Sequence, residues 1–171
     1  MTTVTGGSWY IAAKPTSYSV VGFILALLGG TIFAGAADLL GQVGLAKLSG
    51  GTPESVLRMI AGAVVDPAAI ADATTVLAIG AAVHFGIILA MVLVYLIAAA
   101  RFPLVNSTPE ISAFGYGMIL AFIMTWIVLP LRWPDQIPGT APLDIIVPLV
   151  RHIALVATPI AITAKLAARR D

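Results

Sequence analysis

The chain has 171 residues, of which 60% are hydrophobic and only 10% are charged, and its formal net charge at pH 7 is +1. This balance excludes a soluble globular domain of ordinary composition and predicts a multi-pass membrane protein whose residues 1–171 form one transmembrane domain. The small net charge argues against nucleic acid as a partner, and the absence of cysteine excludes disulfides, iron–sulfur clusters and thiol catalysis.

The first apolar segment, residues 19–46, is long enough to cross the hydrocarbon core of a bilayer as a helix. Small residues recur there at every fourth position, and the series ends in two polar groups: Gly22, Ala26, Gly30, Ala34, Asp38 and Gln42. Small residues at this spacing allow another helix backbone to approach closely. We therefore expect the small residues to dock a neighbouring helix and the two polar groups to be buried away from lipid.

A short amphipathic segment follows the first span. Thr52, Pro53 and Glu54 supply an N-cap, a proline at the first helical position and an early acid, and apolar residues then recur at helical spacing. This pattern predicts a helix over 53–65. Because it is too short to cross the bilayer, we expect it to lie in the interface.

The second span, residues 73–100, contains one ionisable group, His84. Ala82, Gly86 and Ala90 form a small-residue ridge on the opposite side of this helix. A helix with a smooth face on one side and a polar group on the other is expected to be enclosed on both sides. We therefore place it at the centre of an antiparallel four-helix bundle.

Two further spans are predicted at 111–130 and 145–168. The third carries the small residues Gly117 and Ala121 and is expected to end at Pro130. The fourth contains Arg151 and His152, and a kink is expected at its internal proline, Pro159. The predicted fold is therefore an all-α membrane bundle of four helices with one short interfacial helix.

An even number of spans places both termini on the same side of the membrane. Five of the nine basic residues fall on that side: Lys14, Arg101, Lys165, Arg169 and Arg170. Because basic loops stay in the cytoplasm, this bias predicts that both termini are cytoplasmic.

Four phrases of the sequence are similar to an uncharacterised family of small four-span bacterial inner-membrane proteins. The phrases are LRMIAGAVVDPAA at 57–69, GAAVHFGIILAMVLVY at 80–95, YGMILAFIMTWIVLPL at 116–131 and RHIALVATPIAI at 151–162. The resemblance implies a bacterial inner-membrane protein. It implies no activity, substrate or cofactor.

The two histidines, His84 and His152, are the candidates for chemistry, and four interpretations remain open, one of which is the handling of protons or ions. A buried histidine can simply form a hydrogen bond with a neighbour such as Asp38 and lock the bundle. Alternatively, His84 and His152 at similar depth could ligate a haem b from both sides, or one of them could ligate a chlorophyll-type pigment. The sequence shows no pattern typical of a metal site, a phosphate loop or a catalytic triad, so it gives no positive signal for an enzyme.

The abundance of small-residue ridges predicts contacts with helices beyond one four-helix core. We therefore expect a non-catalytic accessory subunit that docks laterally on a larger membrane complex, respiratory or photosynthetic, with lipid and other transmembrane helices, or further copies of itself, as partners. The docking residues would be Gly22, Ala26, Gly30, Ala82, Gly86, Ala90, Gly117 and Ala121. A bis-histidine haem b electron-transfer bundle and a small oligomeric transporter or channel are the alternatives.

Overall fold

The structure, a computed structural model, describes residues 16–70, 72–135, 139 and 141–168. These residues form helices and turns without a strand. Four helical segments are long and apolar enough to cross a membrane: Val20–Leu48, Ala73–Arg101, Pro109–Arg132 and Pro142–Ala167. The predicted all-α fold with four candidate spans is therefore confirmed.

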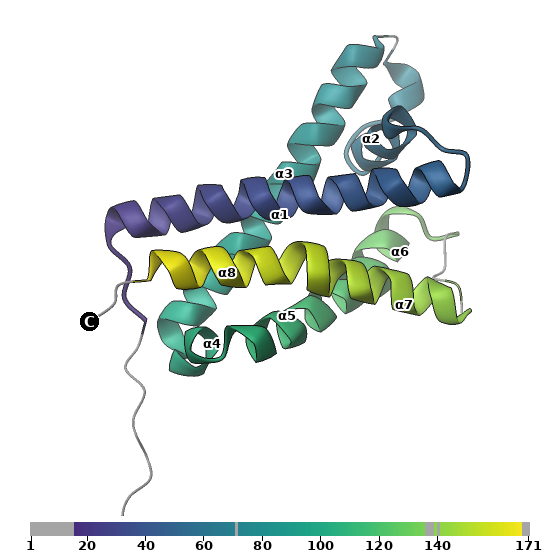
Figure 1. Ribbon diagram of the computed structural model, residues 1–171. Helices are drawn as coiled ribbons and strands as arrows, with labels where there is room; N and C mark the ends of the chain where they lie inside the picture. Colours follow the sequence, from purple (N-terminus) through teal and green to yellow (C-terminus); the bar gives the residue numbers. More distant parts are fainter. Residues whose placement is uncertain (1–15, 71, 136–138, 140, 169–171) are drawn as a thin grey trace, which may run out of the picture.

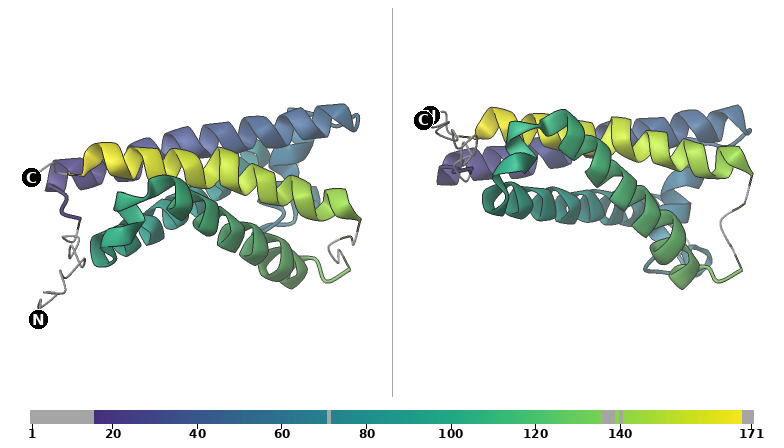
Figure 2. Two further views of the ribbon diagram at one scale, coloured as in Figure 1. Left: turned by 60° about the horizontal axis from the view of Figure 1, so that its bottom comes forward. Right: turned by 90° about the horizontal axis from the view of Figure 1, so that it is seen from below.

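The four spans converge at one end of the molecule and separate at the other. Helix α1 (Val20–Leu48) lies antiparallel beside α8 (Thr158–Ala167) and η3 (His152–Ala157), and α7 (Pro142–Arg151) continues this span in the other direction. Helix α3 (Ala73–Arg101) crosses behind α1 and α8 at a steep angle (Figure 1). Helix α5 (Pro109–Ile123) contacts α8 and then diverges from α7 (Figure 2). The start of α1 and the end of α8 lie at the same end of the molecule, as an even number of crossings requires.

The apolar core lies in the half of the bundle where the spans converge. It joins the first half of α1, the second half of α3, α5 and α8, and its fully buried large side chains include Tyr95, Leu96 and Ile160. Tyr116 adds a tertiary hydrogen bond there, since its hydroxyl donates to the carbonyl of Met91 at 2.7 Å. Among the residues that the structure describes, the opposite half contributes no comparable cluster of buried apolar side chains, and it is there that a cavity forms.

Local capping sets where the helices begin. Thr52 and Ser55 form a reciprocal capping box at the start of α2 (Pro53–Ala61). Asp72 caps α3 by accepting hydrogen bonds from the backbone of Thr74 and from the backbone and hydroxyl of Thr75. These hydrogen bonds, led by that of the Thr75 hydroxyl, lower the pKa of the exposed Asp72 carboxyl below its ordinary value.

Helix α2 ends earlier than the predicted range of 53–65. Residues 62–65 form tight turns, and a single 3₁₀ turn, η1 (Pro67–Ala69), follows. Pro67 restricts Asp66 to an extended conformation, so that α2 cannot continue into it. Helix α2 packs on α3 where Gly80 leaves room for the backbone of Leu57.

Two spans contain π-helical segments next to prolines. The third span continues beyond Pro130 to Arg132, through η2 (Met124–Val128) and α6 (Leu129–Arg132), so the prediction that the helix ends at Pro130 was wrong. The fourth span contains η3 (His152–Ala157) just before Pro159. A proline lacks an N–H and clashes with the carbonyl four residues earlier, and the wider π turn relieves both problems without ending the helix. A short helix that the sequence did not predict, α4 (Pro103–Ser107), joins the second and third spans.

The small-residue ridges of the first and third spans are used inside the chain. A Cβ at Gly22 would lie 2.8 Å from the carbonyl oxygen of Ala167, and one at Gly117 would lie 2.6 Å from the Cα of Ile153. Ala26, Gly30 and Ala121 are also buried. Within the single chain, these ridges therefore contact α8 and η3.

The small-residue ridge of the second span lies on the outer surface of the chain and not inside it. Ala82, Gly86 and Ala90 are exposed, and nothing lies within 4 Å of a Cβ built at Gly86. The buried face of α3 instead carries Gly80 and His84. The prediction that this helix is enclosed on both sides therefore fails for the single chain, and its small-residue face points outward.

These contacts predict opposite outcomes for two glycine-to-leucine substitutions. We expect Gly117→Leu to destabilise the fold by about 2 kcal/mol or more, because a side chain there overlaps the backbone of η3. Gly86→Leu should leave stability unchanged or slightly raised, since the added side chain enters open space and leucine favours a helix over glycine. Thermal unfolding in detergent, followed by near-ultraviolet circular dichroism, measures the difference; equal melting temperatures would contradict the described packing.

Candidate functional site

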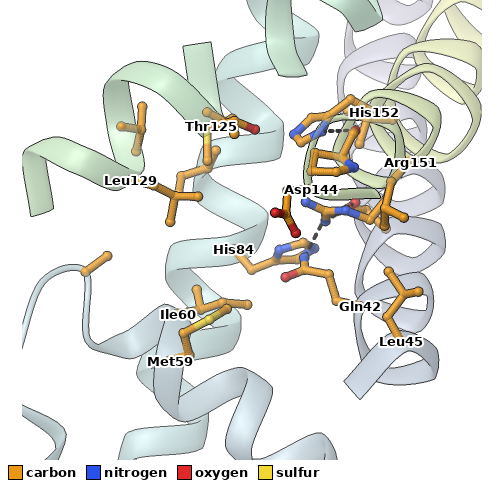
Figure 3. Close-up of a pocket in the computed structure, with 18 of the residues that line it drawn as sticks. Gln42, Leu45, Met59, Ile60, His84, Thr125, Leu129, Asp144, Arg151 and His152 are labelled. Carbon is orange, nitrogen blue, oxygen red and sulfur yellow. Dashed lines mark hydrogen bonds and ion pairs between the residues drawn. The ribbon is translucent and has the colours of Figure 1, made fainter. Parts of the chain in front are cut away.

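A cavity of about 800 Å³ lies in the half of the bundle where the spans separate (Figure 3). Its walls come from α1, α2, α3, η2, α6 and α7 and are mainly apolar, with Leu45, Met59, Ile60, Ile88, Met124 and Leu129 among the lining side chains. The polar residues that line it are few and come from α1 and its C-cap, α3, η2, α7 and η3: Asp38, Gln42, Ser49, His84, Thr125, Asp144, Arg151 and His152. This combination of apolar walls and a few polar groups is typical of a small-molecule site.

An ion pair between α1 and α7 borders the cavity. The Asp38 carboxylate accepts from the Arg151 guanidinium at 2.7 Å and from the Gln42 amide at 2.8 Å. Asp38 is only 4% exposed. Both carboxylate oxygens are thus satisfied, while Arg151 has further N–H groups that this pair does not use.

The expected hydrogen bond between Asp38 and His84 does not form. His84 is buried on α3, and its Nε2 lies 2.9 Å from the carbonyl oxygen of Gly35. A carbonyl can only accept, so Nε2 must carry the proton, and Nδ1 is left with a lone pair when the ring is neutral. Asp38 instead pairs with Arg151, whose long side chain reaches further into the bundle than the sequence pattern indicated.

His152 has the complementary arrangement. Its Nδ1 lies 2.8 Å from the carbonyl oxygen of Pro148 in the preceding turn, so Nδ1 is the protonated nitrogen and Nε2 has the lone pair. The side chains of His152 and Thr125 point toward each other from facing spans (Figure 3). No hydrogen bond links them among the described residues, and the Thr125 hydroxyl has no other partner there.

The two π-helical segments carry these facing groups. Thr125 is the buried residue of η2, and His152 is the first residue of η3. A π turn rotates the following side chains relative to a regular helix, and such turns are frequent at functional sites. Each π-helical segment is followed in the sequence by a proline, Pro130 or Pro159. From the sequence alone, these prolines predict only a helix end and a kink.

The site brings together all four residues expected as buried polar groups. Asp38, His84 and His152 are 4–5% exposed, and Gln42 is half-buried beside them. As possible haem ligands the two histidines are unequal: His152 has a free Nε2, whereas His84 has only Nδ1 unless its bond to Gly35 breaks. Among the described residues, no group of three or more His, Cys, Asp or Glu side chains could hold a metal ion.

The chain matches no protein-family model, no curated protein and no solved structure. The resemblance to a four-span bacterial family therefore stays a prediction from the sequence phrases.

The ion pair predicts a specific pattern of stability. Asp38→Asn leaves the Arg151 charge unpaired and should cost about 3 kcal/mol of unfolding free energy, as expected when one partner of a buried pair is removed. The double variant Asp38→Asn with Arg151→Gln should recover a large part of this loss, because no unpaired charge remains. Denaturation of the two variants in detergent tests this; a double variant less stable than Asp38→Asn would contradict the pairing.

Proposed function

We propose that this protein binds a membrane-dissolved amphiphile in the cavity between its spans. The observation that carries the proposal is the cavity of about 800 Å³ itself, which has apolar walls and hydrogen-bonding groups gathered around Arg151 and His152. Known ligand sites have volumes of about 300–1,000 Å³ with similar linings. A cavity enclosed by membrane spans draws its ligands from the lipid phase most readily.

The polar groups favour a neutral head group with oxygen atoms. The charge of Arg151 is already compensated by Asp38, so a second negative charge is not needed. The remaining N–H groups of Arg151 and the Thr125 hydroxyl can donate, while Nε2 of His152 and the Asp144 carboxylate can accept. A head group with carbonyl or hydroxyl oxygens matches this set, and both a glyceride and an isoprenoid quinone or quinol contain it.

This proposal replaces lateral docking as the first functional hypothesis. The docking hypothesis depended on surplus ridges, and those of the first and third spans are occupied within the chain. No arrangement of the cavity residues identifies a reaction, so the proposed role is binding, as in a carrier, sensor or ligand-dependent subunit.

Filling the cavity should remove the ligand. We expect Ile87→Trp, which adds bulk to the cavity wall, to raise the dissociation constant for the amphiphile about tenfold, equivalent to roughly 1.4 kcal/mol of binding free energy. Leu89→Trp is the matched control, because Leu89 is exposed on the same helix and does not line the cavity. Native mass spectrometry after mild extraction measures occupancy, and lipid extraction identifies the head group.

Three results would contradict this proposal. The protein could retain no amphiphile at all, the two tryptophan variants could retain it equally, or the bound molecule could be a pigment. An absorption spectrum of the same preparation distinguishes the last case: bis-histidine haem gives a Soret band that is lost in His152→Ala, and a chlorophyll absorbs in the red or near infrared.

Docking on a larger complex remains the second candidate, supported by the outward ridge of α3. Ala82, Gly86 and Ala90 offer the close approach that helix association in lipid requires, and no part of the described chain covers them.

If this surface docks a partner, Gly86→Leu should dissociate the complex without loss of the fold. Native mass spectrometry of the mildly extracted wild-type protein and variant tests this expectation, with Gly29→Leu as the control at another glycine with open space around it. A wild-type protein that is monomeric at every detergent concentration would count against the docking hypothesis. A homo-oligomer with ion-dependent conductance would favour the transporter alternative.

We further propose that the protein resides in the bacterial inner membrane with both termini in the cytoplasm. The support is the sequence resemblance and the bias of basic residues toward the side of the termini. Among those residues, Arg101 and Lys165 lie at or near the ends of α3 and α8 in the structure. Lys14, Arg169 and Arg170 lie outside the described residues. In this orientation the cavity half of the bundle faces the periplasm.

A further inference from the structure

A second, shallower groove adjoins the cavity on the outer surface of the bundle. It has a volume of about 360 Å³ and is formed by α1, α2 and α7. Six residues line both the groove and the cavity: Gln42, Leu45, Met59, Val147, Pro148 and Arg151. The groove and the cavity are therefore adjacent, with the polar side chains of Gln42 and Arg151 at their boundary.

The wall formed by α7 is weakly fixed to the bundle. None of its residues, Pro142–Arg151, is buried, although the helix is largely apolar. Its firm attachments lie at its carboxyl end, where Arg151 pairs with Asp38 and the chain continues into η3. Helix α7 also contacts α5. Because none of its side chains is buried, it can move with a small loss of packing.

We infer that the groove between α1, α2 and α7 is the lateral opening through which the amphiphile passes from the bilayer, and that its hydrocarbon chain lies in this groove when the head group is bound. This inference rests on the proposed binding function and specifies the class of ligand: a lipid with at least one chain long enough to reach from the cavity to the bilayer.

Two features of the groove match a hydrocarbon chain. Apart from Gln42, Ser55 and Arg151, its lining is apolar, so it offers a chain few groups that would lose hydration. The polar exceptions Gln42 and Arg151 stand at the boundary with the cavity, where the head group and the chain of an amphiphile would meet.

The absence of native cysteine allows the opening to be closed covalently. The variant Met59→Cys with Val147→Cys places one thiol on α2 and one on α7, both in the groove. A cleavable bis-maleimide can then join them in the reconstituted full-length protein. The control pair, Val21→Cys with Leu166→Cys, joins the exposed surfaces of α1 and α8 at the opposite, closely packed end.

The probes are a diacylglycerol and a benzoquinone, each with a photoreactive diazirine directly beside its head group, added to protein in phosphatidylcholine nanodiscs. Flash photolysis at successive times, followed by fragment-ion mass spectrometry, measures the labelling of the cavity segment 84–91 at its buried lining residues His84 and Ile88. Labelling of the exposed segment 32–33 reports probe in the surrounding lipid. Comparison of the two probes identifies which head group enters.

We expect the groove cross-link to slow labelling of the cavity segment about tenfold, as for closure of an active-site lid, and cleavage of the linker to restore it. The control cross-link should change neither segment. Equal cavity labelling with and without the groove cross-link would overturn the lateral opening while leaving the binding function intact. If neither probe labels the cavity of the uncross-linked protein, the proposed binding function itself fails.

Discussion

The buried ion pair between Asp38 and Arg151 is the interaction on which the open half of the bundle depends. Among the described residues, it is the ion pair that links two spans, because the other pair lies within α2. It joins α1 to the carboxyl end of α7 beside the cavity. Charges within a membrane are costly unless they pair, so this contact fixes where α7 begins to separate from α1. The hydrogen bond of Gln42 to the same carboxylate leaves neither oxygen unsatisfied.

The two halves of the molecule use different means of association. In the converging half, glycines and alanines allow α1, α8 and α5 to approach closely, and apolar side chains fill the space between them. In the separating half, the spans are linked by polar contacts: Asp38 to Arg151 and His84 to the Gly35 carbonyl. Polar contacts can bridge a gap that small residues cannot, so a cavity persists there without disrupting the fold.

Hydropathy and capping signals were sufficient to predict the class of fold and four spans, because length and apolar content alone decide whether a helix crosses a bilayer. They also identified Asp38, Gln42, His84 and His152 as buried. The partners were harder to predict, since a ridge such as Gly117 or Gly86 looks the same whether it meets its own chain or faces outward. Arg151 was missed as a partner of Asp38 because 113 residues separate them in sequence. The two π-helical segments were not predicted, because a proline in a sequence indicates the end of a helix as readily as a π-helical turn before it.

The steep crossing of α1 and α3 has a consequence for how the protein responds to its membrane. Each helix has 29 residues and is therefore about 43 Å long, whereas the hydrocarbon core is roughly 30 Å thick. Because the two helices cross, they cannot both lie along the bilayer normal, and hydrophobic mismatch must be met by tilt. A thinner bilayer would increase the tilt and spread the two helices further apart where they already diverge. We therefore expect the width of the cavity to depend on membrane thickness, and lipid composition to regulate the site without contacting any residue in it.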